Sequence, residues 1–66
     1  MSSFECRFLD RQGRPFPQGF PIDAINIDNA IDRAFDALAN VPHNIGFELR
    51  DQDRVVHHFL QRYRAY

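Results

Sequence analysis

The stretch NIDNAIDRAFDALAN, residues 26–40, decides the fold of this chain. Its apolar side chains recur at intervals of three and four residues, which at about 100° per residue places them on one stripe of a helix. The stripe consists of Ile27, Ala30, Ile31, Ala34, Phe35 and Leu38. Asn26 suits an N-cap, Asn40 can adopt the left-handed C-terminal conformation, and Pro42 forbids continuation. We therefore predict one amphipathic helix over residues 27–39.

Strand patterns lie on both sides of this helix. Residues 4–9 alternate apolar with charged side chains, as in a strand with one buried face, and a turn follows at residues 10–13. Residues 45–50 alternate in the same way, and the turn residues 51–54 lead into a returning strand at 55–60. The stretch 14–21 contains three prolines, so it can form at most a short edge strand around residues 15–17 or an ordered loop.

The register of the closing hairpin stays open, because residues 55–60 are apolar on both parities. Pairing Leu49 with Val56 turns one set toward the core: Val56, His58 and Leu60. Pairing Leu49 with Val55 turns the other set inward: Val55, His57 and Phe59. A bulge of one residue interchanges the two sets, so the sequence does not decide which histidine faces the core.

These elements predict an α+β fold: a three- or four-stranded, mainly antiparallel sheet with one helix packed on one face. The chain order is strand-strand-helix-strand-strand or strand-helix-strand-strand. Residues 1–66 form a single small domain, with residues 61–66 as a frayed or partner-packed tail. Seven phenylalanines in so short a chain suggest that the second face of the sheet is also apolar, in which case a second copy is its simplest cover.

Bulk properties narrow the class of protein. The net charge of −1 gives no global attraction to nucleic acid or to an anionic membrane. Cys6 is the one cysteine, the N-terminus lacks a basic region before an apolar run, and no apolar run approaches the roughly 20 residues that span a bilayer. We therefore expect a soluble cytoplasmic protein without a membrane partner.

The order of parts resembles a family of very short bacterial proteins of unknown function. The resemblance covers roughly residues 4–59 and depends on the helix phrase DAINIDNAIDRAFDAL and the hairpin FELRDQDRVVHHF. It implies a bacterial protein with an opening strand, an alanine-spaced helix and a closing hairpin. It implies no functional residues.

Two charged groups of opposite sign are candidate partner surfaces. Asp28, Asp32 and Asp36 stand at four-residue steps, so a helix places them in one row about 6 Å apart. This row is typical of a solvated face and could also meet a basic partner. The C-terminal group carries arginines and tyrosines without a carboxylate: Arg54, Arg62, Tyr63, Arg64 and Tyr66.

Catalytic and metal sites are not predicted. His57 and His58 are adjacent on a strand and must point to opposite faces, and the chain has no pair of closely spaced cysteines to join His43 and Cys6 in a zinc site. Cys6 shares its parity with core residues, where a thiol behaves as a small hydrophobe. We expect no enzyme activity, no metal, no cofactor and no small-molecule substrate.

The sequence does not determine the function, but it favours one hypothesis. A small thin-cored domain with opposite charge groups is typical of a non-enzymatic interaction domain that self-associates as a homodimer, through its sheet face or an edge strand together with the C-terminal tail. The alternative is weak binding of single-stranded RNA or DNA by the C-terminal arginines and tyrosines.

Overall fold

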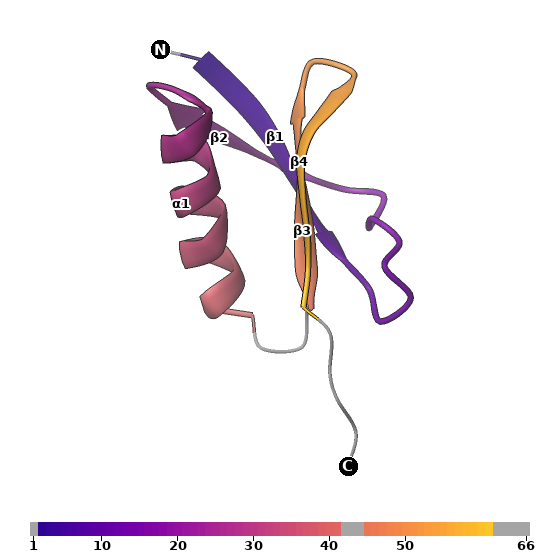
Figure 1. Ribbon diagram of the computed structural model, residues 1–66. Coiled ribbons are helices and arrows are strands. Elements are labelled where there is room, and N and C mark those ends of the chain that lie inside the picture. The colour runs from indigo at the N-terminus through magenta and orange to yellow at the C-terminus, as the bar shows by residue number, and fades with distance from the viewer. Residues whose placement is uncertain (1, 42–44, 62–66) are drawn as a thin grey trace.

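The computed structural model describes residues 2–41 and 45–61, which form four strands and one helix (Figure 1). The elements are β1 (Ser2–Leu9), β2 (Phe20–Ala24), α1 (Ile27–Ala39), β3 (Gly46–Asp51) and β4 (Arg54–Leu60). The strands form one sheet in the order β2-β1-β3-β4, and every neighbouring pair is antiparallel. The helix packs on one face of this sheet. The α+β prediction with two strands on each side of the helix is confirmed.

Helix α1 spans the predicted residues. Asn26 is its N-cap in extended conformation, and its side-chain oxygen accepts a hydrogen bond from the Asn29 N–H at 2.8 Å. The left-handed conformation expected of Asn40 is wrong, because this residue has φ −87° and ψ −4°. Its backbone N–H bonds the Ala37 carbonyl at 3.2 Å and its side-chain amide donates to the Asp36 carbonyl at 3.1 Å. The last carbonyls are therefore satisfied without positive φ.

Small side chains set the contact between helix and sheet. Ala30 and Ala34 are fully buried and Leu38 is nearly so, whereas Ile27 and Phe35 at the sides of the stripe are 38% and 39% exposed. Alanines let the helix backbone lie close to the sheet, and this leaves the larger residues at the rim of the contact. The core beneath the helix consists of Phe4, Cys6, Ile22, Ala24, Ala30, Ala34, Leu38, Phe47 and Leu49.

Strand β2 lies where the proline argument did not place it. The edge strand expected around residues 15–17 is reduced to one isolated bridge between Leu9 and Pro15. The strand forms instead at Phe20–Ala24, with Pro21 inside it and opposite Glu5 of β1. Proline is tolerated here because β2 is an edge strand of the sheet.

A bulge in the closing hairpin settles which histidine faces the helix. Leu49 lies opposite His57, and the register then shifts so that Arg50 lies opposite Val55. Neither predicted partner of Leu49 is therefore correct. His57 shares the helix side with Leu49, and His58 lies on the other side opposite Glu48. His57 is half-buried and His58 is exposed.

The second face of the sheet is not the apolar surface that the phenylalanine content suggested. Five of the seven phenylalanines lie on the helix side of the sheet, namely Phe4, Phe8, Phe20, Phe47 and Phe59. On the far side the buried apolar residue is Leu9, and the loop that follows it lies there, since a Cβ added to Gly13 would come within 3.6 Å of the Leu60 side chain. Figure 1 shows this loop on the side of the sheet away from α1.

The turn of the hairpin carries local strain that a substitution can relieve. Gln52 has φ 58°, a conformation that costs a side-chain-bearing residue about 1 kcal/mol and costs glycine nothing. We expect Gln52→Gly to raise the free energy of unfolding by about 0.5–1 kcal/mol in a urea titration, although glycine also gains entropy in the unfolded chain.

Asp53→Gly is the matched control for this turn. Asp53 is not among the residues with positive φ, so glycine there gains freedom in the unfolded state without relieving strain. A stabilisation by Asp53→Gly equal to that by Gln52→Gly would contradict the strain assigned to Gln52.

Candidate functional site

The row of helical aspartates lies in solvent. Asp28, Asp32 and Asp36 are all exposed on the side of α1 away from the sheet. Among the residues that the structure describes, no group of three or more histidine, cysteine, aspartate or glutamate side chains could hold a metal ion. Within residues 2–41 and 45–61, neither of the two salt bridges involves this row.

The basic C-terminal group is described only at its first member. Arg54 opens β4, is exposed, and lies opposite Asp51 across the hairpin turn. Arg62, Tyr63, Arg64 and Tyr66 lie outside the described residues. The structure thus places Arg54 next to an acidic turn.

The helix leaves β4 largely uncovered, so part of the core lies exposed beside this strand. Helix α1 contacts β2, β3 and β1, and lies on the β2 side of the sheet in Figure 1. Phe35 of α1 reaches toward β4, where its ring centroid lies 4.7 Å from that of Phe59 and 5.0 Å from that of Phe47. The His57 ring lies 5.9 Å from the Phe47 ring. We call Phe35, His57 and Phe59 the aromatic strip; Phe35 is 39% exposed and the other two are half-buried.

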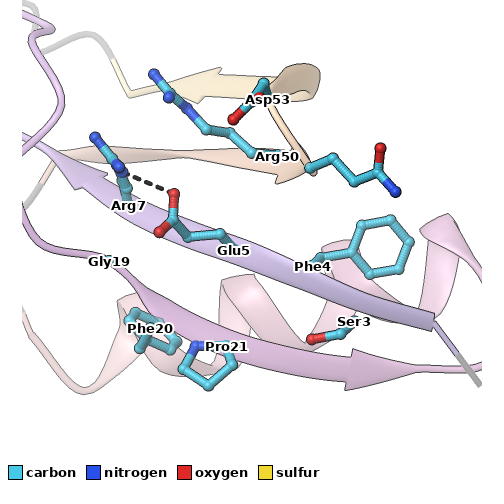
Figure 2. A pocket seen from close by; sticks show the side chains of 10 residues that line it. Ser3, Phe4, Glu5, Arg7, Gly19, Phe20, Pro21, Arg50 and Asp53 are labelled. Carbon is cyan, nitrogen blue, oxygen red and sulfur yellow. Dashed lines mark hydrogen bonds and ion pairs between the residues drawn. The ribbon is translucent and has the colours of Figure 1, made fainter.

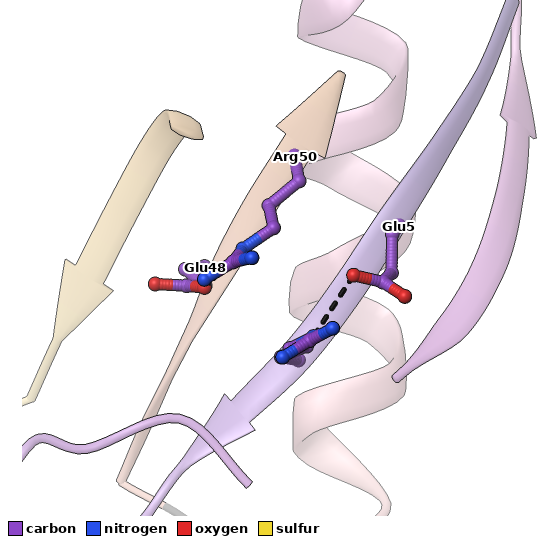
Figure 3. Close-up of polar contacts among 4 residues, drawn as sticks. Glu5, Glu48 and Arg50 are labelled. Carbon is purple, nitrogen blue, oxygen red and sulfur yellow. Dashed lines mark hydrogen bonds and ion pairs between the residues drawn. The ribbon is translucent and has the colours of Figure 1, made fainter. Parts of the chain in front are cut away.

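The face of the sheet opposite the helix carries a chequered set of charges. Arg7 donates through Nε to Glu5 at 2.8 Å, and Arg50 donates through Nε to Glu48 at 2.6 Å (Figure 3). The register also places Glu5 opposite Arg50 and Arg7 opposite Glu48 on the neighbouring strands. Each carboxylate therefore has a guanidinium group along its own strand and another across from it, so the face carries a balanced charge.

Glu48 is the buried member of this set. The residue is 6% exposed, yet no buried side-chain nitrogen or oxygen lacks a hydrogen-bond partner in the described part of the chain. A carboxylate in this position requires its cationic partner, because a buried charge without a partner costs several kcal/mol. The pattern Glu-x-Arg on each of the two strands was visible in the sequence as charges of opposite sign two residues apart, but the placement of one pair opposite the other needs the strand order.

A shallow concavity of about 420 Å³ lies on this charged face (Figure 2). The Glu5 and Arg7 pair forms its floor, Arg50 and Asp53 form one wall, and Pro21 of β2 lies on the other side. Gly19 lies at its end, where an added Cβ would come within 2.8 Å of the Cys6 carbonyl oxygen and of the Arg7 side chain. The two charged groups in the floor, Glu5 and Arg7, are already paired with one another.

Cys6 is buried in the hydrophobic core and does not line the concavity on the charged face. Its residue is fully buried among the helix-facing side chains, opposite Leu49 on β3 and Phe20 on β2. Burial raises the pKa of the Cys6 thiol from its ordinary value of 9.0 to about 11. The thiol is therefore neutral at physiological pH and is a poor nucleophile.

Comparison with known proteins gives no further guide. No protein-family model, curated protein or solved structure matches this chain. The resemblance to short bacterial proteins therefore stays a prediction. Within residues 2–41 and 45–61, no helix is long and apolar enough to cross a membrane.

We expect Glu48→Gln to destabilise the protein by about 1–3 kcal/mol, because the variant loses a charge-assisted hydrogen bond in a buried position. Glu5→Gln is the matched control: its side chain is 41% exposed, and exposed pairs contribute about 0–1 kcal/mol. Urea denaturation of both variants measures the difference. Equal losses would show that Glu48 is not specially dependent on Arg50.

The thiol of Cys6 predicts a loss of stability at alkaline pH. The pKa of this thiol is higher in the folded chain than in the unfolded chain. Its contribution to the free energy of unfolding is therefore complete below about pH 9 and is lost as the pH rises to about 11. The free energies of unfolding of the wild type and of Cys6→Ala should therefore converge over this range, by on the order of 2–3 kcal/mol. Both proteins carry the same tyrosines, so tyrosine ionisation cancels in the comparison. A difference that is constant from pH 8 to pH 11 would contradict the raised pKa.

Proposed function

We propose that the protein is a non-enzymatic interaction domain whose partner is a second copy of itself. The observation that carries this proposal is the exposure of Phe35 beside the half-buried Phe59, on the part of the core that α1 does not cover. A phenylalanine buries about 200 Å² when it is fully enclosed, so Phe35 leaves about 80 Å² of apolar surface in water. A second copy would cover this surface and thicken a core that is small for a chain of 66 residues.

The charged face of the sheet is the less suitable surface for this association. Its carboxylates and guanidinium groups are already paired within one copy. Bringing two such faces together would remove water from four charged groups on each copy. No new ion pair would form to offset this cost in desolvation. Of the two surfaces that the sequence left open, the side of β4 is therefore favoured.

Single-strand binding remains the alternative, with Arg54 as its one described residue. The acidic residues Asp51 and Asp53 beside Arg54 reduce the positive potential that a phosphate chain needs. A labelled oligonucleotide, titrated at low and moderate salt, tests this alternative separately from the self-association.

Sedimentation equilibrium over a range of micromolar concentrations tests the proposal. We expect the average mass to rise with concentration from 7.8 kDa toward twice that value. Phe35→Gln keeps a good helix former while removing the exposed ring, and we expect it to weaken association by at least about tenfold. Phe16→Gln is the matched control, because Phe16 is 41% exposed and lies on the loop after β1, outside the aromatic strip.

Circular dichroism on each variant shows that the fold is retained. A folded wild type that stays at 7.8 kDa at every concentration would remove the proposal. An equal effect of Phe16→Gln and Phe35→Gln would leave the self-association standing but would show that it does not use the aromatic strip.

A further inference from the structure

We propose that two copies join through their β4 edges, paired antiparallel, so that two four-stranded sheets become one continuous sheet with both helices on the same face. This inference rests on the proposed self-association and names the surface that performs it. It is carried by the backbone of β4, whereas the proposed function is carried by the exposed side chains next to it.

The hydrogen bond of Gln61, just after β4, shows in which direction each residue of the strand points its backbone N–H and C=O groups. The Gln61 N–H donates to the Ile45 carbonyl at 2.7 Å, so Gln61 turns its polar backbone groups toward β3. In an antiparallel pair this direction alternates with each residue. His57 and Phe59 therefore point their N–H and C=O groups toward β3, while His58 and Leu60 point theirs away from it. Since β4 is at the edge of the sheet, these groups face outward.

The two edges of the sheet differ in their readiness to accept another strand. Strand β2 has five residues, and Pro21 removes one of its donors. Strand β4 has seven residues and contains neither proline nor lysine, which are the residues that commonly protect an edge. The bulge at Leu49 and Arg50 disturbs only its first part, so the regular segment His57–Leu60 remains open for pairing.

Charge favours a second copy as the occupant, in the antiparallel direction. A two-fold centre between His57 and Phe59 separates Arg54 from its own copy by about 20–33 Å, which is beyond the screening length of about 8 Å. A parallel pairing would set the two arginines side by side. The antiparallel pairing likewise keeps the two acidic turns with Asp51 and Asp53 apart, whereas a parallel pairing would set them side by side.

The area that pairing of the two β4 strands would bury sets the expected affinity of the dimer. Seven residues of strand extend for about 23 Å, and a contact about 15 Å deep buries on the order of 350 Å² on each copy. Stable complexes bury about 800 Å² per partner, so the dimer belongs to the weak class. We expect a dissociation constant of at least micromolar order.

Proline substitution tests the edge directly. His58→Pro removes an outward N–H without removing a bond to β3, and it should weaken dimerisation at least about tenfold while the monomer stays folded. His58→Ala is the matched control, because it loses the same side chain but keeps the N–H, and it should dimerise as the wild type does. Equal dimerisation by the two variants would overturn the pairing through β4.

Disulfide trapping provides a second test, which does not depend on the fold of the proline variant. Facing residues of an antiparallel pair lie on the same side of the sheet, so the two-fold centre must fall on one residue, and only that residue meets its own copy. In a Cys6→Ser background, His57→Cys, His58→Cys and Phe59→Cys should give one sharp maximum of cross-linked dimer under mild oxidation. Asp23→Cys on the β2 edge is the control and should give little.

The outcomes separate the inference from the proposed function. A wild type that is monomeric at all concentrations removes both. A dimer that cross-links best through Asp23→Cys, or through none of the four positions, retains the self-association and rejects the β4 edge.

Discussion

A single helix about 10 Å wide must cover a sheet whose four strands, at about 4.8 Å spacing, are about 14 Å across before their side chains are counted. The helix cannot cover all four strands, and its fully buried alanines, Ala30 and Ala34, hold it close to a part of them. It lies over β2, β1 and β3, and the helix side of β4 is the remainder. The half-burial of His57 and Phe59 and the exposure of Phe35 all follow from this mismatch in width. The candidate interaction surface is thus a consequence of how the core is built.

The face of the sheet opposite the helix is exposed to water over the same four strands. It has no second helix in the described part of the chain, so its side chains must tolerate water. Glu5, Arg7, Glu48 and Arg50 do so by pairing along each of the two central strands, with opposite charges on facing residues, and the loop after β1 lies on the side of the buried Leu9. The charges on this face neutralise one another and the loop after β1 lies over one end of it. Contact with a partner would therefore bury little apolar surface there. This contrast supports the proposal that association uses the edge of the sheet and not its charged face.

The sequence predicted the bounds of the helix, because the apolar period and the N-cap both pointed to residues 27–39, but it was wrong about the conformation of Asn40. It predicted β1 and β3 from alternation and β4 as the return of a hairpin after the turn at residues 51–54. It did not place β2, since Pro21 argues against a strand unless that strand is known to lie at an edge. The hairpin register depended on a bulge that leaves no mark in the composition of residues 49–56. Among the candidate residues, the helical aspartates are exposed to solvent, as their pattern indicated. That β4 is an edge strand could not be predicted, because it depends on the strand order, which the sequence does not contain. The alternation of Glu and Arg was readable, but its pairing across strands was not.

The central claim is that β4 presents His58 and Leu60 as free backbone partners for a second copy. Amide hydrogen exchange, measured residue by residue at low and at high protein concentration, tests it most directly. The account predicts that the amides of His57, Phe59 and Gln61 are protected at both concentrations, while those of His58 and Leu60 exchange rapidly in dilute protein and become protected as concentration rises. Rapid exchange of His58 and Leu60 at every concentration, in a protein whose other strand amides are protected, would contradict it.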